Sequence, residues 1–103
     1  MAVEPLSEKE IQDRLAELPG WSVAEGELLT RTYTFAGHLP AAAMVVHVSA
    51  IQEELDHHAD MTLGYNKLTL AVNTHSVGGH LTDLDFTLAT RVEAVAAGHG
   101  ARS

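Results

Sequence analysis

The sequence has no cysteine and few aromatic residues, which narrows the chemistry it can carry. Without cysteine there are no disulfides and no thiolate metal sites. The chain also lacks a glycine-rich phosphate loop and a Gly-x-Ser-x-Gly elbow. One tryptophan, two tyrosines and two phenylalanines are too few for a platform that stacks nucleic acid bases. Any catalysis must therefore depend on imidazole, which gains or loses a proton near neutral pH.

Basic residues are scarce as well. Six Lys and Arg stand against 14 Asp and Glu, and the formal net charge is −8. A nucleic acid duplex or an anionic membrane surface requires clustered positive charge, so neither partner is expected. No apolar run approaches the ~20 residues that span a bilayer. Residues 1–10 are acidic and lack the apolar core of a signal peptide, which favours a cytoplasmic location.

The length of 103 residues, 46% of them hydrophobic, fits one domain over residues 1–103. We expect its ends, residues 1–6 and 98–103, to be frayed. Two capping boxes, Ser7–Glu10 and Thr82–Asp85, predict the starts of the first and last helices.

Periodicity predicts the remaining elements. Helical spacing of apolar residues indicates a central helix from about Pro40 to Asp56. Alternation of apolar and polar residues predicts strands near Trp21 to Val23, over Leu28 to Phe35, in a short segment ending at Tyr65, and over Leu68 to Asn73. The order αββαββα predicts an α+β fold, in which helices pack on one face of a four-stranded antiparallel sheet.

The central helix has more apolar surface than one core stripe requires. Val45 and Val46 widen the stripe that runs from Met44 to Leu55. A four-stranded sheet also leaves edges that need cover. Both features predict a homo-oligomer, at least a dimer.

Three histidines with nearby carboxylates form the candidate site. His57 and His58 end the central helix, and His75 follows the strand that ends at Asn73. A hairpin at Tyr65–Lys67 would bring His75 to the other two. Glu53 precedes His57 by one helical turn and is placed to interact with it.

Other interpretations of these residues stay open. Histidines are common at helix ends as caps or surface groups. The spacing of Glu53 and His57 also suits a metal, but adjacent histidines diverge on a helix and no His-x-x-x-His pair supports a closed site. The other four histidines have weaker claims: His38, His47, which we expect to be solvated, His80 in a glycine-rich loop near the site, and His99 in the tail.

The run Glu53-x-x-x-His57-His58, followed by Tyr65, Thr74-His75 and Asp85, resembles the signature of the pterin-4a-carbinolamine dehydratases. Members of that family also serve in animals as a dimerisation cofactor of a homeodomain transcription factor. The resemblance extends from about Ser7 to Val95, and the family shares the αββαββα order. The resemblance also implies a homodimer or a homotetramer. Two features depart from it: Ala59 replaces the usual proline, and His80 is an extra residue in a loop.

The resemblance implies dehydration of a 4a-hydroxytetrahydropterin to the quinonoid dihydropterin, with no cofactor and no metal. By matched position, His57 and His75 would act as acids on the hydroxyl, and His58 would bind the ring and assist proton transfer. The residues that would line or tune the pocket are Glu53, which would orient His57, and Asp56, Asn73 and Thr74. The alternative is a non-catalytic interaction or assembly module on the same fold.

Overall fold

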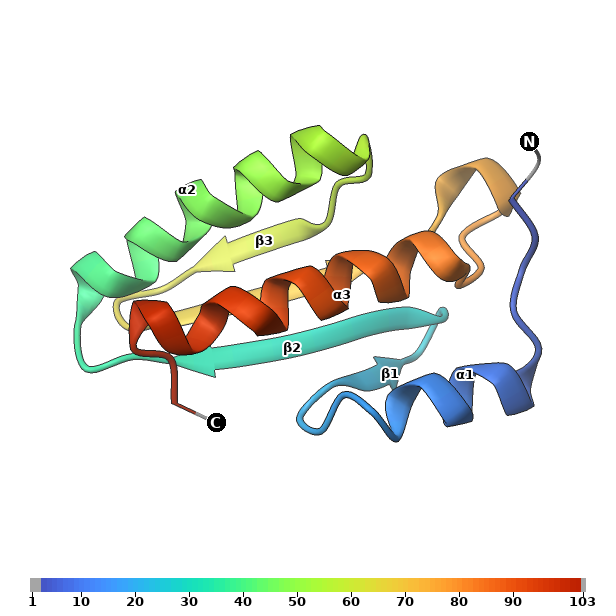
Figure 1. Cartoon of the computed structure of the whole chain (residues 1–103), viewed down its shortest axis with the longest axis horizontal. Coiled ribbons are helices and arrows are strands. Elements are labelled where there is room, and N and C mark those ends of the chain that lie inside the picture. The colour runs from blue at the N-terminus through green and yellow to red at the C-terminus, as the bar shows by residue number, and fades with distance from the viewer. Residues whose placement is uncertain (1–2, 103) are drawn as a thin grey trace.

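A four-stranded antiparallel sheet, covered on one face by helices, forms the protein (Figure 1). The computed structural model describes residues 3–102. In chain order the elements are α1 (Glu8–Leu15), β1 (Ser22–Ala24), β2 (Leu28–Thr34), α2 (His38–Leu55), β3 (Asp60–Leu63), β4 (Lys67–Val72), η1 (His75–Val77), α3 (Asp83–Ala96) and η2 (Ala97–His99), where η marks a short 3₁₀ helix. The strand order is β1-β2-β4-β3, which confirms the predicted α+β fold.

The two faces of the sheet differ in polarity because side chains alternate along each strand. In the central pair β2·β4, Leu29 lies opposite Val72 and Thr34 lies opposite Lys67. Leu29 and Tyr33 of β2 are buried with the apolar residues of β4. Thr30, Thr32 and Thr34 point to the other side, which we call the open face, and Thr32 bonds Thr69 there.

The hydrophobic core lies between the sheet and the helices. Figure 1 shows α2 and α3 lying across the same face of the sheet. Met44, Val48 and Ile51 of α2 are buried with Leu88 and Val92 of α3. Apolar spacing on α2 therefore predicted its buried stripe from Met44 to Ile51, while Leu55 at the end of the stripe is partly buried.

Both predicted capping boxes are confirmed. Ser7 and Glu10 exchange side-chain and backbone hydrogen bonds at the start of α1. These bonds from the Ser7 backbone and hydroxyl hold the pKa of Glu10 below its ordinary value. Thr82 and Asp85 do the same at the start of α3.

The end of α1 and the start of α2 lie near prolines. The first helix, α1, ends at Leu15, four residues before Pro19. The chain then turns through tighter bonds, such as Leu18 N–H to the Leu15 carbonyl at 3.0 Å. The second helix begins at His38 rather than Pro40, since a proline in the first turn sacrifices no intrahelical bond.

The chain ends make backbone contacts with the fold. The Leu6 N–H donates to the Leu81 carbonyl at 2.8 Å, and Arg102 pairs with Thr34 of β2. We expected residues 1–6 and 98–103 to be frayed, and part of that expectation falls on residues 1, 2 and 103, which lie outside the described residues. No helix in residues 3–102 has the length and apolar character required to cross a bilayer.

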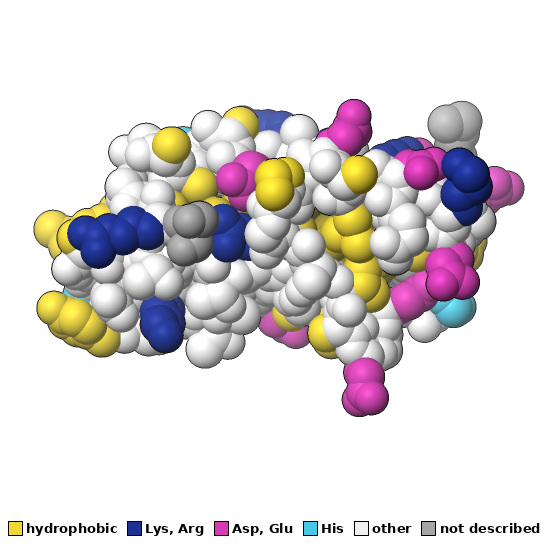
Figure 2. Space-filling view, turned by 90° about the horizontal axis from the view of Figure 1, so that it is seen from below, with side chains coloured by type: hydrophobic (Ala, Val, Ile, Leu, Met, Phe, Trp, Pro, Cys, Tyr) yellow, Lys and Arg dark blue, Asp and Glu magenta, His cyan; other side chains and the backbone are white. Residues whose placement is uncertain are grey.

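Basic side chains are few in this protein. Figure 2 views the molecule from below Figure 1, and on this face the described Lys and Arg side chains are scattered rather than gathered into one patch. A phosphate backbone is bound by grouped positive charge. The expectation that the protein does not bind nucleic acid stays a prediction.

Large apolar side chains are exposed on α2, where Leu39 is 78% and Val46 is 72% accessible. These two residues are seven positions apart, so they lie on the same helical face.

We expect this apolar face of α2 and the edges of the sheet to be covered in at least a dimer. Light scattering at tens of micromolar should give a mass of twice 11.0 kDa or more, and Val46→Glu should reduce it, whereas a monomer mass for the unchanged protein would contradict the expectation.

Candidate active site

The end of α2 sets the directions of the two adjacent histidines. The helix ends at Leu55, and Asp56 adopts a left-handed conformation with φ 50° and ψ 44°. The His57 N–H then donates to the Gln52 carbonyl at 3.1 Å, and the chain turns into β3 at Asp60. Aspartate tolerates left-handed backbone better than most residues, which permits this abrupt turn without glycine.

His57 points into the interior, where a buried carboxylate holds it. Its Nε2 lies 2.6 Å from Oδ1 of Asp85, and the His57 side chain is only 10% exposed. Because a carboxylate accepts hydrogen bonds, Nε2 of His57 is the donor and carries a proton. The Nδ1 atom of His57 is therefore the nitrogen that remains for a substrate.

Asp85 is fully buried and its second oxygen is also satisfied. Oδ2 accepts hydrogen bonds from the Thr74 hydroxyl and from the Thr82 N–H, both at 2.8 Å. The Thr74 hydroxyl also lies 2.8 Å from that of Thr82. The predicted pocket residue Thr74 is therefore a buried partner of Asp85. Our sequence reasoning treated Asp85 as a helix cap and a motif position, and it missed the contact with His57.

His58 points away from the interior and pairs with Glu53. Its Nε2 lies 2.6 Å from Oε2 of Glu53, and the imidazole is 52% exposed. The prediction that Glu53 orients His57 is wrong. It assumed that helix α2 continues through His57. Because the backbone of Asp56 is left-handed, the chain turns away from the helix, and His58 instead of His57 contacts Glu53.

A small cavity joins His58 to His75 on the open face of the sheet. Its volume is about 130 Å³, and it is lined by Leu28, His58, Asp60, Ala71, Val72, Asn73 and His75. The structure thus brings His58, His75 and Asn73 together, whereas His57 and Thr74 lie behind them at Asp85. Asp56, the helix C-cap, is exposed and outside this lining.

Asp60 is a lining residue that sequence reasoning missed. It begins β3 and pairs with Ala71 of β4, so its side chain points to the open face. The available signal was its place at the start of a predicted strand, two residues after His58. Asp60 adds a carboxylate close to two imidazoles.

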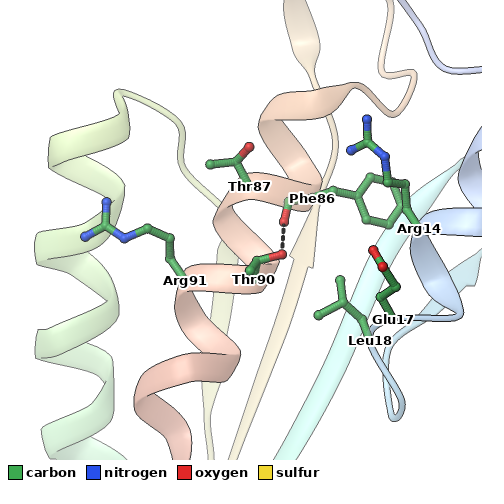
Figure 3. A pocket seen from close by; sticks show the side chains of 7 residues that line it. All are labelled: Arg14, Glu17, Leu18, Phe86, Thr87, Thr90 and Arg91. Atoms are coloured by element: carbon green, nitrogen blue, oxygen red, sulfur yellow. Dashed lines mark hydrogen bonds between the residues drawn. The ribbon is translucent and has the colours of Figure 1, made fainter.

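A larger cavity lies elsewhere and has no histidine in its lining. It has a volume of about 590 Å³, and Figure 3 shows its walls on α1 and α3. Arg14 contacts the Phe86 ring and bonds Asp83, while Arg91 points toward α2 and bonds Glu54 at 2.6 Å. Both cations are thus already paired, so we place the candidate site at the smaller, histidine-lined cavity.

The other histidines are held by partners outside the small cavity. His80 lies 2.6 Å from a carboxylate oxygen of Glu27, and His38 stacks on Tyr65. His47, which we expected to be solvated, is exposed but lies 2.8 Å from Nε2 of His99. Within residues 3–102, no three His, Asp or Glu side chains are grouped so that they could hold a metal ion. Independence from metal stays a prediction.

The family description "Pterin 4 alpha carbinolamine dehydratase" matches residues 4–95 of this chain. The chain belongs to this family. A protein of Streptomyces avermitilis is 63% identical, with 98% of this chain and 99% of that protein covered, and one of Streptomyces coelicolor is 60% identical over the same shares. Both carry provisional names as pterin-4-alpha-carbinolamine dehydratases.

Solved structures agree with this membership. A transcriptional coactivator/pterin dehydratase from Brucella melitensis superposes with a TM-score of 0.85 at 31% identity, covering 90% of this chain and 99% of that one. A pterin dehydratase-like protein identified as a RuBisCO assembly factor in the α-carboxysome gives a TM-score of 0.64 at 18% identity, covering 77% and 92%. The second likeness shows the fold alone.

The buried carboxylate of Asp85 yields a stability prediction. In Asp85→Asn, the amide cannot accept every bond that the carboxylate accepts, so buried donors lose their partner. We expect the free energy of unfolding to fall by about 1–3 kcal/mol. Denaturant unfolding should be compared with Asp83→Asn, an exposed aspartate two residues earlier, which should cost less than about 1 kcal/mol. Equal losses in both variants would contradict a special role for Asp85.

Proposed function

We propose that the protein dehydrates a 4a-hydroxytetrahydropterin to the quinonoid dihydropterin by histidine acid–base catalysis. The observation that carries this proposal is the small cavity that His58, His75 and Asn73 line, together with His57, the residue before His58, which Asp85 holds. Membership of the family and the names of relatives support the same reaction.

The reaction needs an acid and a base but no net proton. The N5 lone pair forms a double bond to C4a as the C4a–O bond breaks. An acid protonates the departing hydroxyl, which leaves as water, and a base accepts the N5 proton. General acid–base catalysis of this kind typically contributes ~10²–10⁴-fold to a rate.

The proposed roles follow the side-chain geometry. His75 lines the cavity and is exposed, so it can protonate the hydroxyl. His57 would act as the second acid through Nδ1 in its imidazolium form, in which Nε2–H donates to Asp85 and Nδ1 carries the proton that is transferred. His58, paired with Glu53, binds the ring and accepts the N5 proton. Asn73 supplies an amide that can recognise polar ring edges.

The size of the cavity limits how a pterin can bind. About 130 Å³ is below the ≈ 300–1,000 Å³ that is usual for pockets enclosing a small molecule. The histidine-lined cavity would therefore hold the reacting part of the ring, while the rest lies over the open face with its threonines.

Activity can be tested directly with freshly generated 4a-hydroxytetrahydropterin. The purified protein should accelerate loss of the carbinolamine absorbance without added cofactor, and a chelator should not change the rate. Replacing His57 and His75 together with alanine should cost far more than either change alone, because one acid can partly cover for the other. His80→Ala is the matched control, since that imidazole is bound to Glu27. A double variant with the rate of the unchanged protein would reject the assignment.

The Glu53 contact gives a separate prediction. Glu53→Gln removes the carboxylate that holds His58, so turnover should fall about tenfold. Glu54→Gln, at the neighbouring position, removes only a surface contact to Arg91 and should leave turnover within about twofold. Steady-state rates of the two variants measured side by side provide the check, and equal effects would argue against a role for Glu53.

The alternative function is a non-catalytic assembly module. The observation that favours it is the exposed apolar face of α2 at Leu39 and Val46. A solved protein of the same fold carries the name of an assembly factor, but at 18% identity it supports the fold only. Absence of dehydration by a folded protein, together with a partner retained by the α2 face and lost in Val46→Glu, would favour this alternative.

A further inference from the structure

Gln52 contacts the backbone on both sides of His58. It lies in the last turn of α2, yet its side chain is only 4% exposed. Its backbone carbonyl accepts the His57 N–H at 3.1 Å, and its side-chain Oε1 accepts the Ala59 N–H at 2.8 Å. One residue therefore holds the amides that precede and follow His58.

We propose that Gln52 is a positioning residue for His58. The inference rests on the proposed function, in which His58 contacts the substrate, but Gln52 itself is not part of the cavity lining. The backbone bond is available to any residue at position 52, whereas the bond to Ala59 requires an acceptor on the side chain. The identity of Gln52 therefore decides whether the residue after His58 is restrained.

This restraint matters because His58 is half exposed, whereas the neighbouring His57 is anchored at buried Asp85. Between the end of α2 and the start of β3 the chain makes a left-handed turn at Asp56, and His58 is half exposed. Its imidazole is held by Glu53, an exposed side chain that alone fixes the ring weakly. With both flanking amides bonded to Gln52, the Cα–Cβ direction of His58 is set, and the imidazole is aimed at the cavity. Displacement of a reacting group by about 1 Å can cost ~10²-fold in rate.

The Ala59 amide also decides how a proline would act there. Proline has no N–H, so Ala59→Pro leaves Oε1 of Gln52 buried without its partner. We therefore expect Ala59→Pro to lower both the melting temperature and the turnover. This variant serves as the second arm of a double-mutant cycle.

The first experiment compares Gln52→Met, Ala59→Pro and the double variant. Methionine keeps the length of the side chain and removes the acceptor. Gln52→Met should reduce turnover about tenfold in the unchanged background and less than about twofold when Ala59→Pro is present, because the bond is then already lost. Gln12→Met, at an exposed glutamine of α1, is the matched control and should leave turnover unchanged. An equal cost of Gln52→Met in both backgrounds would mean that Gln52 only packs, and would overturn the proposal.

A second measurement does not depend on turnover or on the folding of the proline variant. In Gln52→Met, NMR should show hydrogen exchange at the Ala59 amide at least about tenfold faster, and shifted ring resonances of His58. Gln12→Met should change neither. Unchanged Ala59 exchange and His58 resonances in Gln52→Met would overturn the positioning role. If the unchanged protein does not dehydrate the carbinolamine, the proposed function fails, while these NMR signals still decide the role of Gln52.

Discussion

The buried carboxylate of Asp85 joins the end of α2, the end of β4 and the start of α3. It contacts His57 after α2, Thr74 after β4 and the backbone of Thr82 before α3. A charged group in an apolar interior is very costly unless every lone pair finds a donor. These segments must therefore meet for the fold to be stable, and when they meet they also fix the ring of His57. Folding and the geometry of the candidate site depend on the same contacts.

A single backbone conformation then separates the two neighbouring histidines. The left-handed Asp56 ends α2 and sends His57 toward the helix side of the sheet, while His58 reaches the open face. The three histidines consequently differ in their surroundings. His57 is nearly buried and bonded to Asp85, whereas His58 and His75 are exposed where they line the small cavity.

Local patterns predicted the fold well, because caps and alternation act over a few residues. Ser7 with Glu10, and Thr82 with Asp85, mark helix starts by chemistry that does not depend on distant contacts. The four strands and the buried stripe of α2 followed from periodicity for the same reason.

Features that depend on distant partners could not be predicted. Arg31 occupies a core-facing position of β2 and is only 9% exposed, above the ring of Tyr33 and 3.7 Å from the carboxylate of Glu93. Its neighbour Gly20 has φ +94°, and a Cβ there would lie 2.8 Å from the guanidinium of Arg31. The candidate site shows the same limit to prediction. The left-handed backbone of Asp56 determines that Glu53 contacts His58 and not His57. His75, by contrast, lines the same cavity as His58, as the predicted hairpin indicated.

The short strand β1 leaves part of β2 unpaired, and Arg102 fills that place by bonding both backbone groups of Thr34. The segment after η2 therefore covers backbone groups of the central strand β2 that β1 does not reach. Loss of this bridge would leave the backbone groups of Thr34 at a strand edge to which another extended chain could bond.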